Sequence, residues 1–278
     1  MRAFRRGVLC SGSVDPTWIL SNYSYLDHGN PGAYGGRDFQ VRSNGLDAYT
    51  INATSNKTIY QHGISPAWDI SSITYASKSF DCSSEVGSYP RSFVIKPDDG
   101  TKLYVSSSDD EMIYQYTLSP AWDISSASYD SKSYNASEAV NLYCIRFSPD
   151  GTKLYCLSES NSYIYQYTLG TAWDISTASY ASKYKDVSGI ADPDTFCISN
   201  DGKHLYVGLS AATAYIYSYP ISTAWDISTA GSSDGSLNID SYCGYYTNGL
   251  NFTSDGTYLL YSSYSDATYR VVQWQLNA

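Results

Sequence analysis

The stretch that decides the fold is Ser148-Pro-Asp-Gly-Thr-Lys-Leu-Tyr155, followed by Ile164-Tyr-Gln-Tyr-Thr-Leu169 and then by Ala172-Trp-Asp-Ile-Ser176. The three phrases recur in this order along the chain. The tryptophan phrase alone stands at Trp68, Trp122, Trp173 and Trp225, with gaps of 54, 51 and 52 residues. Self-similarity at a period near 50 residues indicates a repeat architecture, in which every repeat is one supersecondary unit.

Each repeat predicts four antiparallel strands. The Asp-Gly pair supplies the positive φ that a tight hairpin needs between the first and second strands. In the second unit we expect the next strands at residues 103–106, 113–118 and 128–134, with the tryptophan phrase turning the corner before the last of them. Alternating apolar residues in the first strand, such as Ile145 and Phe147, predict that this strand packs in the core.

The two ends of the sequence complement each other. Residues 16–25 form a fifth tryptophan phrase that stands out of phase, and the fifth Tyr-Gln-Tyr-like phrase ends at Leu276, two residues before the chain stops. We therefore predict an all-β, five-bladed β-propeller over residues 16–278, with four antiparallel strands per blade and a last blade closed by the N-terminal strand at 23–27. A sixth unit from another chain, or exchange of the N-terminal strand between subunits, would also complete a ring.

Composition excludes several classes of protein. The 278 residues hold 17 basic and 27 acidic side chains, so the net charge is −10 and a nucleic-acid partner is not expected. No apolar run approaches the roughly 18 residues of a membrane helix, so we expect no membrane insertion. The six cysteines lie at non-equivalent places without a C-x-x-C pair, which predicts free, mostly buried thiols. The apolar run after the basic start, residues 8–10, is too short for an export signal, so cytoplasmic synthesis is expected.

The phrase at 148–155 resembles the hairpin of YVTN and WD40-like propeller repeats of bacterial surface proteins. The longer string through the tyrosine and tryptophan phrases resembles repeats of tail and fibre proteins of bacterial viruses. This resemblance implies a non-enzymatic virion module, such as a tail-associated, fibre or decoration protein. Its expected partners are other virion proteins, docked through a basic arm at residues 1–15, and a host-surface glycan or protein. A fold does not determine a function, so a cell-surface carbohydrate-binding or adhesion protein is the first alternative.

Two kinds of loop follow from the strand order. The Asp-Gly turns and the tryptophan corners share one face of the ring, and we expect the tryptophan and aspartate of each corner to be scaffold. The opposite face carries the loops that vary most between repeats, and variable loops on a regular scaffold often bind ligands. Aromatic faces beside acids suit sugars, and the acids suit Ca²⁺, although a solvated acidic rim would look the same. The candidate binding residues are Asp109, Asp110, Glu111, Tyr163, Asp240, Tyr242, Tyr245 and Tyr246.

Signals of catalysis are weak. The three histidines occupy non-equivalent positions, and no nucleophile elbow or phosphate-binding loop is present, so we predict neither a metal centre nor catalytic residues. The remaining alternative is a lactonase-like or glycoside-acting propeller enzyme. Such an enzyme would need carboxylates or histidines from several blades to converge in the central channel.

Overall fold

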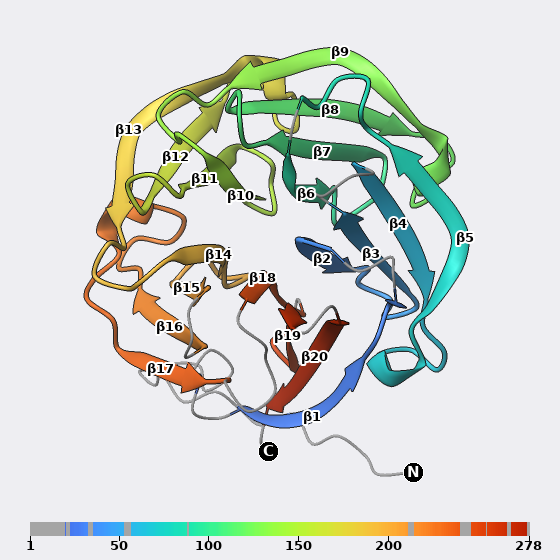
Figure 1. Ribbon diagram of the computed structural model, residues 1–278. Coiled ribbons are helices and arrows are strands. Elements are labelled where there is room, and N and C mark those ends of the chain that lie inside the picture. The colour runs from blue at the N-terminus through green and yellow to red at the C-terminus, as the bar shows by residue number, and fades with distance from the viewer. Residues whose placement is uncertain are drawn as a thin grey trace.

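The computed structural model describes residues 20, 23–32, 36–52, 57–87, 89–210, 214–239, 246–253, 255–265 and 268–276. In this part of the chain the strands form five sheets of four antiparallel strands each. Figure 1 shows the sheets arranged as blades around a central axis. The prediction of an all-β, five-bladed propeller is confirmed.

The first four blades follow the chain in order, from an inner to an outer strand. Blade 1 comprises β2 (Asp38–Val41), β3 (Asp47–Asn52), β4 (Thr58–Gly63) and β5 (Thr74–Asp81). Blade 2 comprises β6 (Pro90–Ile95), β7 (Lys102–Ser107), β8 (Met112–Leu118) and β9 (Ala127–Asn135). Blade 3 comprises β10 (Leu142–Phe147), β11 (Lys153–Ser158), β12 (Tyr163–Leu169) and β13 (Ala178–Asp186). Blade 4 comprises β14 (Pro193–Ile198), β15 (His204–Leu209), β16 (Tyr215–Pro220) and β17 (Gly235–Asn238).

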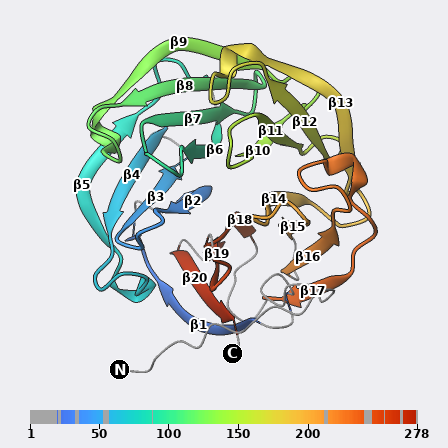
Figure 2. The same ribbon diagram turned by 180° about the vertical axis from the view of Figure 1, so that it is seen from behind.

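Blade 5 joins the two ends of the chain. It comprises β18 (Tyr246–Phe252), β19 (Tyr258–Ser265), β20 (Thr268–Leu276) and, as its outer strand, β1 (Tyr23–Gly29). β1 pairs with β20 from Tyr23 opposite Leu276 to Gly29 opposite Val271. Figures 1 and 2 show β1 along the outer edge of this blade. The predicted closure by the N-terminal strand is confirmed, and the ring is complete within one chain.

The Asp-Gly turn and the tryptophan corner of the same blade pack against each other. In blade 3 the turn residue Gly151 has a φ of 69°, and a Cβ atom added to it would lie 2.3 Å from the Trp173 ring. The Trp173 N–H also donates a hydrogen bond of 3.0 Å to the Gly151 carbonyl. We call this end of the ring the corner face. It carries the turn glycines and tryptophans of each repeat, and the opposite end, with the connections between second and third strands and between blades, is the loop face.

Three hydrogen bonds tie each blade to the next and recur at three interfaces. A tyrosine of the second strand donates to the tryptophan carbonyl of the next blade, a glutamine of the third strand accepts from a corner N–H, and a lysine of the fourth strand pairs with the corner aspartate. Between blades 2 and 3 the distances are 2.5, 2.9 and 2.5 Å. The donors and acceptors in order are Tyr49–Trp122, Tyr104–Trp173 and Tyr155–Trp225; Ile124–Gln61, Ile175–Gln115 and Ile227–Gln166; Lys78–Asp123, Lys132–Asp174 and Lys183–Asp226.

The seam between blades 5 and 1 is built differently. Leu260 stands at the tyrosine position, and Asp27 stands at the lysine position opposite Gln273. Gln273 keeps the glutamine, but its amide nitrogen has no hydrogen-bond partner in the described part of the chain. Trp68 instead stacks on Tyr258 of blade 5, with ring centroids 5.8 Å apart. Sheet pairing of β1 therefore closes the ring where these repeated ties are missing, and the Asn251 side chain of blade 5 adds a hydrogen bond to the Phe39 carbonyl of blade 1.

The cysteine prediction holds for the residues that can be checked. Cys82, Cys144, Cys156 and Cys197 are free and buried, whereas Cys10 and Cys243 lie outside the described residues. Among the described residues no helix is long and apolar enough to cross a membrane.

Candidate functional site

The predicted acidic loop lies between β7 and β8 on the loop face. Asp109 is exposed there. Asp110 accepts hydrogen bonds from the Tyr114 hydroxyl at 3.2 Å and from the Met112 N–H at 3.4 Å. Glu111 accepts one from the Asn141 N–H at 3.4 Å. Asp110 thus bonds to the strand that follows it, and Glu111 bonds to the loop that precedes β10. No group of three or more His, Cys, Asp or Glu side chains in the described residues is placed to hold a metal, so the Ca²⁺ prediction has no ligand set there.

The second predicted cluster falls largely beyond what the structure describes. Asp240, Tyr242 and Tyr245 lie outside the described residues. Tyr246 begins β18, and its side chain is likewise not described. These four residues remain predictions.

Tyr163 belongs to a group of contacting rings on blade 3 that runs from the buried Tyr165 to the exposed Tyr184. Its ring stacks on Tyr184 at 4.9 Å with an interplanar angle of 7°. Tyr165 contacts both rings, and Tyr180 continues the row 5.8 Å from Tyr165. Tyr184 is 47% exposed. We call these four residues, which lie on β12 and β13, the tyrosine platform. Their positions are set by register, since Tyr165 pairs with Tyr184 across the two strands.

A different set of side chains surrounds the axis at the loop face. The inner strands of blades 2 to 5 each contain a β-bulge near their start, shown by shifts of register after Pro90, Leu142, Pro193 and Thr247. A bulge turns one side chain away from its ordinary direction. The residues at these bulges, with the equivalent residue just before β2 in blade 1, form what we call the polar ring: Arg37, Arg91, Tyr143, Asp194 and Asn248.

Four members of the polar ring line a cavity of about 270 Å³, which we call the loop-face mouth. Glu159, Asp192 and Ser210 complete its polar lining, so side chains from four blades converge there. The Arg91 guanidinium lies 4.5 Å from the Tyr143 ring centroid, which holds the cation at the wall of the mouth. Glu159 accepts a hydrogen bond from the Asn141 side chain at 3.2 Å.

Three buried polar atoms of the ring lack partners in the described part of the protein: Asp194 Oδ2, Arg91 Nε and Asn248 Oδ1. Asp194 is only 8% exposed. Burial raises the pKa of its carboxyl from 3.8 to about 7, against the opposing effect of Arg37 and Arg91. A buried polar atom without a partner costs about 1–3 kcal/mol, and native proteins keep few of them. The two on Arg91 and Asp194, which both line the mouth, therefore indicate a site prepared for a ligand.

Sequence reasoning missed the polar ring because it looked for function in loops, whereas these residues lie within or next to the first strands. The signal was present in the repeats. Two residues further along, every inner strand carries an apolar side chain: Phe39, Phe93, Ile145, Phe196 and Leu250. The ring position itself holds two arginines, a tyrosine, an aspartate and an asparagine. A position that carries four residue types in five repeats of a regular strand marks the variation that function requires.

Between the loop face and the corner face, a salt bridge crosses the axis of the ring. Arg146 of blade 3 donates two hydrogen bonds to Asp38 of blade 1, with N–O distances of 3.0 and 3.1 Å. Ser92 of blade 2 also donates to Asp38, at 2.5 Å. Burial alone would lower the pKa of Arg146, but the adjacent Asp38 carboxylate outweighs it and raises the pKa. The guanidinium is thus permanently charged and held between blades.

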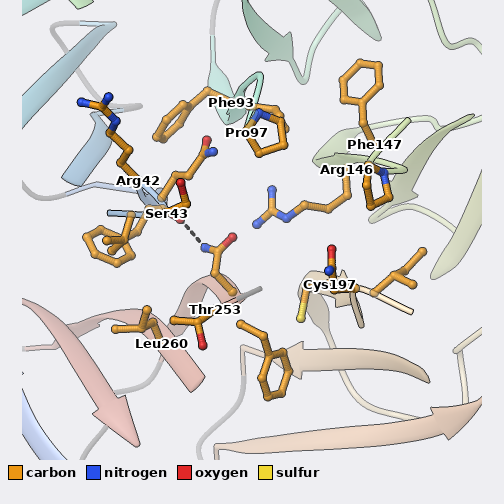
Figure 3. Close-up of a pocket in the computed structure, with 18 of the residues that line it drawn as sticks. Arg42, Ser43, Phe93, Pro97, Arg146, Phe147, Cys197, Thr253 and Leu260 are labelled. Atoms are coloured by element: carbon orange, nitrogen blue, oxygen red, sulfur yellow. Dashed lines mark hydrogen bonds between the residues drawn. The ribbon is translucent and has the colours of Figure 1, made fainter. Parts of the chain in front are cut away.

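On the corner face the axis opens into a second cavity of about 220 Å³. The four corner tryptophans contribute to its lining. Figure 3 shows Arg146 pointing from blade 3 into the middle of this cavity, with Phe93 and Phe147 at its wall. This cavity is mainly apolar, because the rings that build the corners also form its sides.

No protein-family model matches the sequence, and no curated protein matches it. Solved structures resemble the fold. A candidate 6-phosphogluconolactonase from Bacteroides uniformis aligns with a TM-score of 0.50 and 16% identity over 79% of this chain and 61% of its own. A protein of unknown function from Desulfotomaculum acetoxidans gives 0.52 and 12% over 82% and 65%. The β-propeller domain of Cps50 (Swd1) from Myceliophteria thermophila gives 0.46 and 9% over 85% and 65%.

The chain spans less than two thirds of the length of each of these structures. At such identities the likeness concerns the fold alone. The protein is a five-bladed β-propeller of tyrosine-rich repeats.

Proposed function

We propose that this propeller is a non-enzymatic recognition module that binds surface glycans through the loop-face side of blade 3. The observation that carries the proposal is the tyrosine platform, a row of contacting rings in which Tyr163 stacks on Tyr184 and Tyr184 reaches solvent. Sugars bind aromatic rings through their apolar C–H faces, while neighbouring polar groups take their hydroxyls.

Polar groups of the required kind border the platform. Asn161 donates a hydrogen bond of 2.6 Å to the Tyr165 hydroxyl, and Tyr163 pairs with Asp186 across β12 and β13. Burial raises the pKa of Tyr165 and of Tyr180, so their hydroxyls remain protonated at physiological pH. Because the rings already contact one another before any ligand binds, little side-chain entropy would be lost on binding.

The setting we propose is the surface of a virus particle that infects bacteria, with a bacterial cell surface as the alternative. Support comes from the resemblance of the repeats to tail and fibre proteins. Mass spectrometry of purified particles tests the setting: the protein should co-purify with capsid and tail proteins. Recovery in the cell envelope instead would favour the adhesion alternative.

Glycan binding is tested on an array of bacterial surface polysaccharides with the labelled protein. We expect Tyr184→Ser to abolish retention on the glycans that the unmodified protein binds. The matched control is Tyr129→Ser, which removes a tyrosine of 37% exposure from the outer strand of blade 2. If neither the protein nor its control variant retains any glycan, or if both variants lose binding equally, the platform is not the binding site.

A hydrolase is the second candidate, and one observation favours it. Glu159 from blade 3 and Asp192 and Asp194 from blade 4 converge at the loop-face mouth, as an enzyme alternative requires. The likeness to a candidate 6-phosphogluconolactonase suggests sugar lactones as the substrates to assay. We expect no hydrolysis above the spontaneous rate. Turnover that disappears in Asp194→Asn would replace the recognition proposal with an enzymatic one.

A further inference from the structure

We propose that the loop-face mouth is a second binding site, separate from the tyrosine platform, and that its ligand is a small polyhydroxy carboxylate such as a sugar acid. The site lies on the axis, on the polar ring, whereas the platform lies on the outer strands of blade 3. The two sites share no residue, so each can be tested without the other.

The mouth is divided by charge: Arg37 and Arg91 line it from blades 1 and 2, whereas Glu159, Asp192 and Asp194 line it from blades 3 and 4. The side with the two arginines selects an anionic group. Arg91 carries a buried Nε without a partner, and no ion pair within 4.0 Å joins it to a carboxylate among the described residues. A guanidinium in this state binds a carboxylate with paired, charge-assisted hydrogen bonds.

The remaining polar atoms select hydrogen-bond donors at separate positions. Asp194 Oδ2 has no hydrogen-bond partner among the described residues, and the carboxyl groups of Asp192 and Glu159 line the same cavity from blades 4 and 3. An ammonium group would present its donors from one point. A chain or ring of hydroxyls presents them several bonds apart, as carboxyl groups on different blades require. The ligand that satisfies Arg91 and these carboxyl groups therefore combines one carboxylate with several hydroxyls.

The size of the mouth agrees with this chemistry. A cavity of about 270 Å³ lies just below the roughly 300–1,000 Å³ of drug-sized sites, so it suits a molecule of monosaccharide size. The surroundings of the mouth also explain why these polar side chains stay in place without a hydrogen-bond partner. Tyr143 holds Arg91 from the side, and the strand on which Asp194 lies is fixed by sheet pairing, so the site exists before the ligand enters.

The test is calorimetric titration of the full chain with D-galacturonate as the probe. D-galactose, which carries a hydroxymethyl group in place of the carboxylate, and L-serine, which adds an ammonium group, are the comparison ligands. We expect galacturonate to bind at least about tenfold more tightly than either. Arg91→Gln should weaken it at least about tenfold and Asp194→Asn at least about threefold, while Tyr184→Ser leaves it unchanged.

The matched control is Asp109→Asn, the same change at an exposed aspartate of the same face. Circular dichroism and melting temperature verify that each variant is folded, and Arg91→Lys serves if Arg91→Gln is not. The proposal is overturned if galactose binds as tightly as galacturonate, if L-serine binds more tightly, if Asp109→Asn and Asp194→Asn have equal effects, or if galacturonate produces no heat with folded protein.

Discussion

The corner face and the loop face of this ring are built from the same strands, yet they differ in what changes between blades. On the corner face the same contacts recur: glycine under tryptophan, tyrosine on a tryptophan carbonyl, lysine on aspartate. Around the loop-face mouth one structural position carries arginine, tyrosine, aspartate and asparagine in turn. The ends also differ in hydrogen bonding, because the corner aspartates that pair with lysines are satisfied and the mouth retains unpartnered atoms.

This difference separates stability from function within one molecule. Each contact that recurs between successive blades adds to the stability of the ring. The residues that are the same in successive repeats therefore hold the blades together. A position that departs from uniformity and leaves buried atoms unpaired lowers stability, and such a cost is typical of binding sites. The predictions below test this assignment from the largest effect to the smallest.

The largest effect is expected at the boundary between the faces. Arg146→Met removes the guanidinium and leaves the buried Asp38 carboxylate without its charged partner, so we expect the free energy of unfolding to fall by about 3–5 kcal/mol. Chemical denaturation measures it. The double variant Arg146→Met with Asp38→Asn should recover part of the loss, because no unpaired charge remains. A loss below about 1 kcal/mol in the single variant would show that the axial pair does not couple the blades.

A glycine pair sharpens the comparison between faces. Gly151→Ala on the corner face forces a side chain into a positive φ of 69° and into the Trp173 ring, and should cost about 3 kcal/mol. Gly189→Ala, between blades 3 and 4 on the loop face, is the control, since a Cβ atom there meets nothing within 4 Å. We expect the control to change the melting temperature little. Equal losses would contradict the assignment of the corner contact to architecture.

The smallest effect has the opposite sign and depends on pH. The folded protein holds a proton on Asp194 up to about pH 7, whereas the unfolded chain loses it near 3.8. The folded state therefore binds more protons between these values, and its stability falls as pH rises through them. Asp194→Asn should remove this dependence and stabilise the protein by about 1–2 kcal/mol above pH 7, because no charge is then buried. Thermal melts at pH 5 and pH 8 measure the difference.

His62 provides an internal check on the sign. Burial lowers the pKa of its imidazole from 6.5 to about 4, so the unfolded chain binds the extra proton and stability falls as pH drops through this range. Asp194→Asn must leave this acid-side loss in place. A variant that lost both dependences would have changed the fold rather than one carboxyl group.

The architecture was predictable because the same sequence phrases recur along the chain. The spacing of Trp68, Trp122, Trp173 and Trp225 predicted the blades, and the displaced phrase at residues 16–25 predicted closure through β1. The scaffold role of the corner aspartates was also predicted correctly, since Asp123, for example, accepts from the Ser125 N–H and pairs with Lys78.

The site was harder to predict for physical reasons. Asp38 and Arg146 are 108 residues apart in the sequence and are brought together only by the arrangement of the blades around the axis, so no local sequence pattern indicates the pair. In the sequence, Asp194 looks like an ordinary polar residue at the start of a strand. Only the fold shows the β-bulge and the burial that set its environment. Tyr163 was identified, but its partners Tyr180 and Tyr184 were not, because they lie on the next strand and only sheet pairing brings them beside it.

The interfaces between blades differ in the contacts that oppose their separation, and the seam between blades 5 and 1 has fewer of them than the three interfaces with repeated hydrogen bonds. At three interfaces a fluctuation must break the three repeated side-chain hydrogen bonds as well as separate the packed blades. Between blades 5 and 1 the described residues offer instead one hydrogen bond from the Asn251 side chain to the Phe39 carbonyl, stacking of Trp68 on Tyr258 and the covalent passage from β1 to β2. We therefore expect this seam to open at lower free energy than those three interfaces. Amides in β1 and β20 should report this opening by exchanging with solvent sooner than amides of blade 3, while the chain still holds the parted blades within reach of each other.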